Sequence, residues 1–396
     1  MREYHALLAP SSAARWLKCP PSARLGEGEP EKTSTDAEKG RLAHAIAELK
    51  ARKKFFPLSK KTYTSQINKL QSDPLYEKVM DGYTDQYVEV LTEHAMSFKS
   101  QPFIALETQV PIGLITGETK EDGSPATGTA DCIQIGDGVL WVTDYKNGSG
   151  IPVSAVENPQ MMLYGLAALI LYRPLFGDTI HTVRTTIVQP ALNSVSDWEI
   201  SRAELETWGR DKVAPIAALA LKGEGELNPG EWCKSHFCPV RHKCRALANS
   251  ALSLEEFKLS LPSTLSPSEI GNILERGELL VSWYNDVKEY ALKEILAGHE
   301  IPGWKAVEGR GSREWTGGVD AAFPALMAAG LEEALLWERK PVTPPALEKV
   351  VGKKVYEEVV KPHVTKVPGK PTLAPESDKR PAYNPAAIAF ATTNNE

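Results

Sequence analysis

Two aspartates, a lysine, a glutamine and a tyrosine stand in three short segments of this chain. They are Asp131 in Gly-Thr-Ala-Asp, Asp144 and Lys146 in Asp-Tyr-Lys, and Gln160 and Tyr164 in Gln-Met-Met-Leu-Tyr. Two carboxylates can hold a hard cation such as Mg²⁺ through oxygen ligands. That ion would polarise a phosphate and lower the pKa of a bound water, while a lysine offsets developing negative charge. The order of the segments therefore indicates metal-dependent phosphodiester hydrolysis.

A β-hairpin is expected to bring the two aspartates together. Residues 129–135 and 139–146 are apolar segments on either side of a Gly-Asp-Gly turn. Antiparallel pairing around this turn places Asp131 roughly opposite Asp144. The two carboxylates can therefore converge.

Alternation along the strands predicts which side chains share a face. Asp144 and Lys146 are two apart and are expected on one face, whereas Cys132 is expected on the face opposite Asp131, as a small core residue. The alternative interpretation is an ordinary surface Asp-x-Lys pair, because that dipeptide pattern is common by chance.

A helix is predicted to follow the hairpin. Asn158 can cap it, Pro159 suits its first turn, and residues 161–171 are apolar. Gln160 and Tyr164 are four apart, so they share one face near the helix start, where a phosphate is favoured. We expect DNA contacts there. Ordinary hydrogen bonds of a buried helix are the alternative.

A second helix is predicted upstream, from a capping box at Thr35 to about Lys50. His44 and Glu48 are one turn apart on it and could present a nitrogen and an oxygen to one ion. Gly40 inside the helix suggests close approach by another backbone or by DNA. A structural histidine is the alternative for His44.

The five cysteines are unevenly distributed. Cys233, Cys238 and Cys244 are clustered, and Cys19 is the obvious fourth thiolate, whereas Cys132 is left over. Four thiolates can hold a [4Fe-4S] cluster.

Two other interpretations of these cysteines remain open. A structural Zn²⁺ could use His236 and His242 as well as the clustered thiolates. Disulfide bonds are a weaker interpretation, since no secretory signal opens the chain.

Together these motifs resemble the PD-(D/E)XK nucleases, and among them the RecB-like branch with an iron–sulfur clasp. The resemblance implies an α/β fold, in which helices flank a central mixed sheet, followed by a mainly helical C-terminal region. The matching motifs are Gly40-x3-His44, Asp131, Asp144-Tyr145-Lys146, Gln160-x3-Tyr164 and the cysteines. The implied Mg²⁺ or Mn²⁺ ligands are His44, Asp131, Asp144 and the Tyr145 carbonyl. The implied catalytic residues are Asp131, Asp144 and Lys146, the DNA contacts Gln160 and Tyr164, and the cluster ligands Cys19, Cys233, Cys238 and Cys244.

A narrower resemblance covers both ends of the chain. Residues 5–19 and 369–380 look like those of a phage and prophage family catalogued only as a domain of unknown function. Such proteins look like parts of viral DNA recombination or replication modules, so candidate partners include phage recombination proteins and single-strand-binding proteins.

Composition limits how the chain could bind DNA. The chain has 396 residues, a net charge of −6 and no apolar run long enough to span a bilayer. DNA affinity must therefore come from a local basic patch and from metal ions. Residues 50–61, in which Phe55 and Phe56 lie among lysines, are one candidate, and a solvated loop is the alternative.

Three segments are predicted along the chain. Residues 1–250 form the nuclease domain, 251–362 a mainly helical accessory region that includes an amphipathic helix at 268–296, and 363–396 an extended or partly disordered tail.

The leading expectation is a Mg²⁺- or Mn²⁺-dependent deoxyribonuclease in a bacterial host cytoplasm, an exonuclease acting on DNA ends in recombination, replication or repair. A catalytically inactive DNA-binding or scaffold relative and a zinc-stabilised binding protein are the alternatives. Strand preference, cleavage polarity and oligomeric state are not encoded by these motifs.

Overall fold

The centre of the structure, a computed structural model, is a mixed five-stranded sheet in the order β1-β2-β3-β4-β5. Neighbouring strands are antiparallel except for β3 and β4, which are parallel. The strands are β1 (Phe103–Val110), β2 (Gly128–Gly136), β3 (Val139–Tyr145), β4 (Thr182–Gln189) and β5 (Ser194–Ser201). Asp137 and Gly138, both with positive φ, form the turn between β2 and β3. The predicted hairpin is thus confirmed.

The structure describes residues 6–27, 29, 35–252, 266–307, 319–328, 336, 343–344, 347–348, 352 and 356–364. The chain divides into two compact units, residues 1–293 and 294–396. The first unit extends past the predicted boundary at residue 250 and contains most of the predicted amphipathic helix, which is confirmed as α12 (Pro267–Leu296). Nearly all of the predicted tail lies outside the described residues.

Helices account for most of the remaining described chain. In the first unit these are α1 (Ala13–Trp16), α2 (Ser22–Leu25), α3 (Thr35–Phe55), α4 (Lys60–Gln71), α5 (Val79–Ser97), α6 (Gly113–Thr116), α7 (Pro159–Phe176), α8 (Arg202–Trp208), α9 (Ala214–Lys222), α10 (Trp232–Ser235) and α11 (Arg245–Leu252). Short helical turns are η1 (Pro10–Ser12), η2 (Pro190–Leu192), η3 (Gly209–Val213) and η4 (Arg241–Lys243). The second unit contains α13 (Val319–Ala328), η6 (Tyr356–Val360) and η7 (Lys361–His363). Among the described helices, none is long and apolar enough to cross a membrane.

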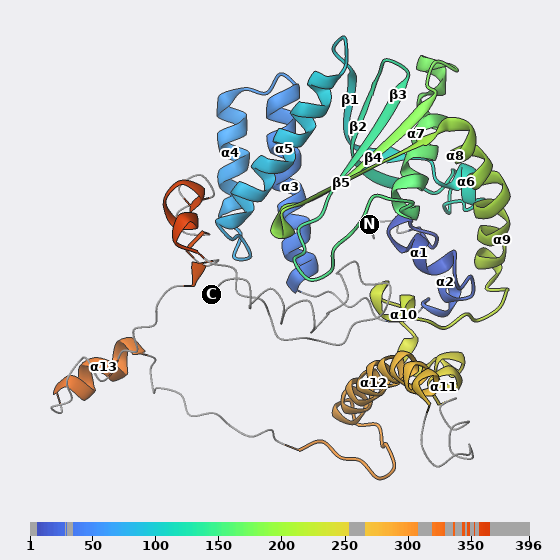
Figure 1. Cartoon of the computed structure of the whole chain (residues 1–396), viewed down its shortest axis with the longest axis vertical. Helices are drawn as coiled ribbons and strands as arrows, with labels where there is room; N and C mark the ends of the chain where they lie inside the picture. Colours follow the sequence, from blue (N-terminus) through green and yellow to red (C-terminus); the bar gives the residue numbers. More distant parts are fainter. Residues whose placement is uncertain are drawn as a thin grey trace, which may run out of the picture. The chain divides into compact units, whose positions relative to one another are not determined.

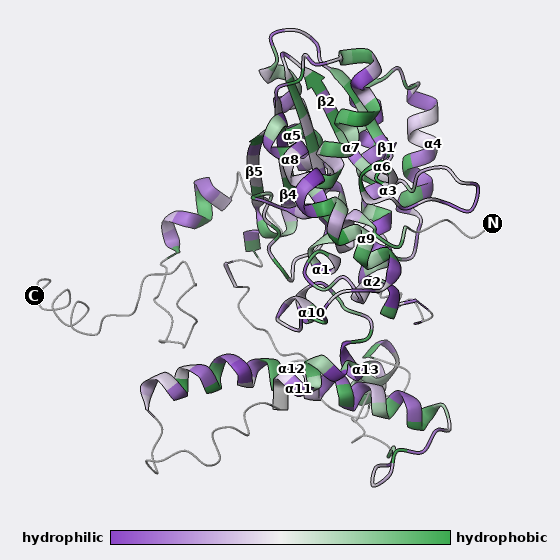
Figure 2. Cartoon of the chain, turned by 90° about the vertical axis from the view of Figure 1, so that its right-hand side faces the viewer, coloured by the Kyte–Doolittle hydropathy of each residue, from purple (hydrophilic) through white to green (hydrophobic). Residues whose placement is uncertain are grey.

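Helices cover both faces of the sheet (Figure 1). On one face, α7 buries Met161 and Ala168 against strand residues that include Val142 and Ile187. On the other face, α3 and α5 form a second core with Leu106 of β1 and with other strand residues. Hydrophobic residues are accordingly frequent on α7 and on the strands (Figure 2). The expectation of a mixed sheet flanked by helices is confirmed.

Helix α7 makes the crossover between the two parallel strands. Its cap is the predicted one, because Asn158 Oδ1 accepts hydrogen bonds from the backbone N–H groups of Gln160 and Met161 at 3.0 and 3.4 Å. Pro159 occupies the first turn, where no backbone N–H is needed. This cap fixes where α7 begins relative to the end of β3.

Helix α3 runs five residues past its predicted end at Lys50. It begins at Thr35 itself, so the capping position before it lies outside the described residues. A Cβ at Gly40 would meet no described atom within 4 Å. No described backbone therefore lies close to this glycine, and close approach by DNA stays a prediction.

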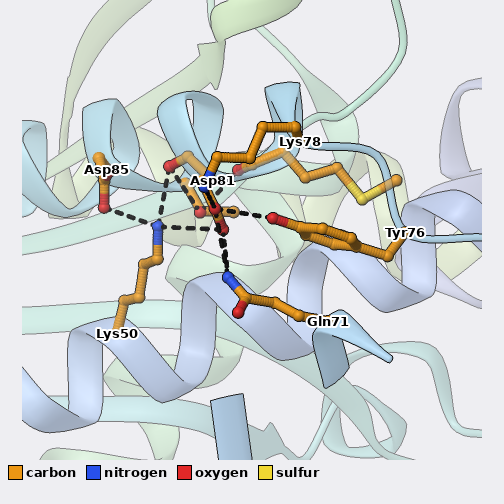
Figure 3. Close-up of polar contacts among 8 residues, drawn as sticks. Lys50, Gln71, Tyr76, Lys78, Asp81 and Asp85 are labelled. Carbon is orange, nitrogen blue, oxygen red and sulfur yellow. Dashed lines mark hydrogen bonds and ion pairs between the residues drawn. The ribbon is translucent and has the colours of Figure 1, made fainter. Parts of the chain in front are cut away.

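A polar network joins α3, α4 and α5 beside the second core (Figure 3). The Asp81 carboxylate accepts hydrogen bonds from Tyr76 Oη at 2.7 Å, Gln71 Nε2 at 3.0 Å and Lys78 Nζ at 2.7 Å. Lys50 Nζ donates to the Asp81 carbonyl at 2.8 Å and to Asp85 at 2.7 Å. These bonds hold the pKa of Asp81 below its usual value although burial opposes them. The three helices thus form one layer on the sheet.

His94 of α5 packs directly on the sheet. Its ring stacks on Trp141 of β3 with ring centroids 3.7 Å apart, and Nδ1 lies 3.3 Å from Thr143 Oγ1. Burial lowers the pKa of His94 to about 4. The folded protein therefore holds this ring neutral.

Because an unfolded histidine titrates near pH 6.5, the stabilisation that depends on neutral His94 is complete above pH 6.5 and is lost as the pH falls toward 4. His94→Phe keeps an aromatic stack without a titrating group. The free energy of unfolding of the wild type should fall relative to this variant by about 2 kcal/mol between pH 7.5 and 5. Denaturant unfolding of both proteins at the two pH values measures this. If the difference in unfolding free energy between the two proteins is the same at both pH values, the lowered pKa of His94 is contradicted.

Candidate active site and cysteine cavity

The predicted carboxylates lie where the β2–β3 hairpin ends. The last pair of the ladder is Cys132 and Thr143. One residue further along β2, Asp131 Oδ2 accepts a hydrogen bond from the backbone N–H of Tyr145 at 2.8 Å. At the end of the hairpin, the Asp131 carboxylate thus replaces a backbone carbonyl as the hydrogen-bond acceptor.

The strands do not alternate regularly at this point. Cys132 packs toward α3 and α5. The preceding residue, Asp131, points to the same side, where it lies near His44 of α3. Glu107 of β1 lies across from Asp131 and has φ +47°, a conformation uncommon for a residue other than glycine. The expectation that Cys132 and Asp131 lie on opposite faces was therefore wrong, because the backbone is distorted here.

His44, Glu107 and Asp131 form a compact group of metal-ligand types. One donor atom from each lies within 4.8 Å of the others, and His44 Nδ1 is 3.4 Å from Asp131 Oδ2. The Tyr145 ring contacts the His44 ring edge-on, with centroids 5.2 Å apart. Glu107 was missed in the sequence, where its only signal is a glutamate inside an otherwise largely apolar strand.

Acidic side chains are concentrated in and around this group. Burial, together with the charges of Asp131 and Glu48, raises the pKa of Glu107 to about 8. Burial raises the pKa of Asp131 to about 6, although His44 opposes the shift. The same cavity is lined by Glu48, which is hydrogen-bonded to Arg52 at 2.7 Å. A bound divalent cation would favour the ionised forms of both carboxyl groups and lower these pKa values.

Asp144 and Lys146 lie beside this group but contact different partners. Lys146 Nζ is 2.9 Å from Asp144 Oδ2, and Gln160 Nε2 donates to Asp144 Oδ1 at 3.1 Å. Lys146 Nζ also donates to Gln160 Oε1 at 3.3 Å. Burial alone would lower the pKa of Lys146, but the Asp144 carboxylate outweighs burial and raises it. Asp144 is not in the three-donor group, so its role as a ligand, like that of the Tyr145 carbonyl, stays a prediction.

The start of α7 contributes Gln160 and Tyr164 next to the candidate site. Gln160 joins the Asp144–Lys146 pair, whereas Tyr164 is buried in the core. A Cβ at Gly128 would lie 3.1 Å from the Tyr164 ring and 3.0 Å from Pro10, so glycine lets these residues approach closely. DNA contact by Gln160 and Tyr164 stays a prediction.

The connection from β3 to α7 is held by a residue that sequence reasoning missed. Gln189 Oε1 accepts a hydrogen bond from the backbone N–H of Val153 at 3.0 Å. Its Nε2 donates to the carbonyls of Gly148 and Ile151 at 2.7 and 2.9 Å. Gln189 is 1% exposed. This buried amide therefore fixes the loop that separates Lys146 from Gln160.

The structure brings together the four predicted cluster cysteines. Cys19, Cys233, Cys238 and Cys244 are free thiols that line one cavity. Burial, with neighbouring cysteines contributing, raises the pKa of the Cys233 and Cys238 thiols. Cys132 is buried elsewhere, in the core between the sheet and α3.

The segment around the last three cysteines packs against α12. Arg241 forms an ion pair with Asp286 at 2.5 Å, and the His242 ring stacks on Tyr290 with centroids 4.5 Å apart. Leu279 and Trp283 contact the buried cysteine cluster from the same helix. Helix α12 therefore belongs to the packing around the cysteine cavity.

Comparison with solved structures finds the crystal structure of SSO0001, which is 14% identical and covers 59% of this chain and 96% of that chain, with a TM-score of 0.22. A similarity this low supports no conclusion about fold or function. A protein-family model described as "Protein of unknown function (DUF2800)" matches residues 5–381, which include every candidate site residue. The expected membership of a family of unknown function is thus confirmed. The chain belongs to the DUF2800 family.

Proposed function

We propose that this protein is a metal-dependent DNA nuclease with a PD-(D/E)XK-like core. The observation that carries the proposal is the group formed by His44, Glu107 and Asp131 beside the Asp144–Lys146 pair. The strand order, with an antiparallel hairpin followed by a helical crossover to a parallel strand, suits such a core. The acidic groups stand at the carboxyl end of β3, where open α/β sheets commonly bind ligands.

The chain's own residues supply the ligands and the positive charge. His44, Glu107 and Asp131 would hold Mg²⁺ or Mn²⁺, with Asp144 as a further carboxylate. When bound, the ion polarises the phosphate and lowers the pKa of a water. Lys146, held by Asp144 and Gln160, is placed to donate to a phosphate oxygen and to offset the negative charge that develops there.

We propose that Cys19, Cys233, Cys238 and Cys244, which line one cavity, hold a [4Fe-4S] cluster, with a structural zinc as the alternative. We further propose that the nuclease acts on DNA ends in phage or prophage DNA metabolism.

Lys146→Ala should lower the rate of Mn²⁺- or Mg²⁺-dependent cleavage of end-labelled linear DNA at least about 100-fold, because it removes the cation beside the reacting phosphate. Lys212→Ala, at an exposed lysine of η3, is the matched control and should cleave like the wild type. Equal inactivity of the wild type and both variants on single-stranded and duplex DNA would leave a binding or scaffold role.

Glu107→Gln should weaken Mn²⁺ binding about ten-fold or more, because a neutral amide replaces one carboxylate of the three-donor group. Without metal, the variant should melt a few degrees higher, since one of two adjacent buried acids is gone. Calorimetric titration with Mn²⁺ and thermal unfolding measure both effects. Glu48→Gln, in the same cavity but bonded to Arg52, is the control, and a larger loss of Mn²⁺ binding in that variant would exclude Glu107 as the ligand.

Cys238→Ala should lose iron, acid-labile sulfide and visible absorbance after anaerobic purification, and its melting temperature should fall, because cluster binding stabilises the fold. Cys132→Ala should retain all three signals, since Cys132 lies in a separate core. Stoichiometric zinc without sulfide in the wild type would select the zinc alternative.

A further inference from the structure

The segment that contains the last three cysteines is strongly basic. Residues 232–245 contain four lysines and arginines and no aspartate or glutamate, in a chain whose net charge is −6. Lys18 also lies here, with Nζ 4.5 Å from the centre of the Trp232 ring. Arg241 pairs with Asp286 and Lys243 with Glu29, whereas Lys18 and Lys234 form no ion pair among the described residues. These two ammonium groups are therefore the positive charges that the segment can offer to a ligand.

Phe237 is the exposed aromatic residue of this segment. Its side chain is 76% exposed and its φ is +50°, a conformation that bulky residues rarely adopt. Two hydrogen bonds hold the backbone in place, from Phe237 N to the Lys234 carbonyl at 3.1 Å and from Arg15 Nη1 to the Phe237 carbonyl at 3.3 Å. The fold thus keeps a phenyl ring in solvent through a strained backbone, an arrangement found most often at functional sites.

The basic stretch at residues 50–61 is the other candidate surface for binding nucleic acid. Lys50 pairs with Asp85 at 2.7 Å, Arg52 with Glu48 at 2.7 Å, and Lys53 donates to the Leu58 carbonyl at 2.7 Å. Phe56, at 39% exposure, is less prominent than Phe237. Both basic stretches are therefore partly neutralised by the protein, and what distinguishes the cysteine segment is the greater exposure of its aromatic ring.

A short path connects the cysteine segment to the candidate active site. Pro10 lies against the position of Gly128, next to Tyr164. From Pro10 the chain runs through η1 and α1 to Cys19, and α1 contacts α10 of the cysteine segment. Nine residues at helical rise span roughly 15 Å. A strand of a few nucleotides could therefore reach from one place to the other.

We propose that Phe237, with Lys18 and Lys234, forms a binding surface for an unpaired nucleic-acid strand, on which the phenyl ring stacks on one base. The inference rests on the nuclease proposed above and assigns its strand-holding surface. Every base has an aromatic face and every phosphate a charge, so an exposed ring and two exposed ammonium groups in one segment of the fold match a single strand without reading its sequence. Both lysines are exposed, as this role requires.

The test measures binding of a fluorescent single-stranded DNA oligonucleotide by anisotropy, without divalent metal, using full-length protein whose cysteine site is loaded. Phe237→Ala should bind about ten-fold more weakly than the wild type. Phe237→Gly, which tolerates the positive φ, should show the same loss and separates the missing ring from misfolding. Phe237→Trp should bind as tightly as the wild type, and Trp304→Ala, at an exposed aromatic residue outside the proposed surface, is the control that should not change.

Salt dependence tests the two lysines separately. Lys18→Ala and Lys234→Ala should each reduce the slope of log affinity against log salt by about 0.7, the value for one phosphate contact on a single strand. Unchanged slopes would overturn their role.

The outcomes separate this inference from the nuclease proposal. Wild-type protein that cleaves DNA, with Phe237→Ala and Phe237→Gly binding equally well, would overturn the surface and leave the nuclease intact. Wild-type protein that binds single strands through Phe237 but never cleaves would support the surface and reject the nuclease. Binding only to duplex DNA would overturn the surface.

Discussion

The crowding of buried carboxyl groups at the end of the β2–β3 hairpin is the constraint around which the site is organised. Glu107 and Asp131 lie side by side in a poorly solvated cavity, and burial opposes the ionisation of both. The charge of Asp131 further opposes the ionisation of Glu107, and the charge of Asp144 opposes that of Asp131. The Tyr145 N–H and His44 favour the charged form of Asp131. Asp144, in contrast, has the Lys146 ammonium and the Gln160 amide. The protein therefore pairs Asp144 with a cation and leaves Glu107 and Asp131 with too little positive charge, and this imbalance distinguishes a cation site from an ordinary ion-pair network.

The parallel β3–β4 pair explains why these groups meet. A parallel connection requires a crossover helix, and α7 starts directly above the strand ends that carry Asp144 and Lys146. The Asn158 cap and the buried Gln189 amide fix the loop length and direction, so that Gln160 reaches both charged partners. Because this positioning depends on backbone hydrogen bonds and burial, it does not require the site to be occupied.

Local signals made much of this predictable from sequence. An Asp-Gly turn between apolar segments specifies the hairpin, and Asn-Pro before an apolar run specifies the start of α7, because both depend on neighbouring residues. Glu107 could not be found this way. The position of the Glu107 side chain depends on a positive φ and on strand pairing with residues about 24 positions further along the chain. The periodicity of side chains in the sequence predicts neither. Because of the same backbone distortion, the expectation that Asp131 and Cys132 face opposite sides of the sheet was wrong. For Gly40 the sequence could not choose between the two predicted neighbours, a backbone and DNA, because a glycine in a helix does not identify what approaches it.

The amino-terminal segment links the two chemical centres. Glu118 accepts hydrogen bonds from the backbone N–H groups of Leu7 and Leu8 at 2.7 and 2.9 Å, and Trp16 is fully buried in a core that includes Leu163 of α7. The segment therefore packs on the helix that carries Gln160 before it delivers Cys19 to the cysteine cavity. A group bound by Cys19 and the three later cysteines would restrain both ends of this packing, and its binding free energy would add to the stability of the fold. Loss of that group should consequently loosen the start of α7, so that the positions of Gln160 and Lys146 depend on a centre to which neither residue contributes a ligand.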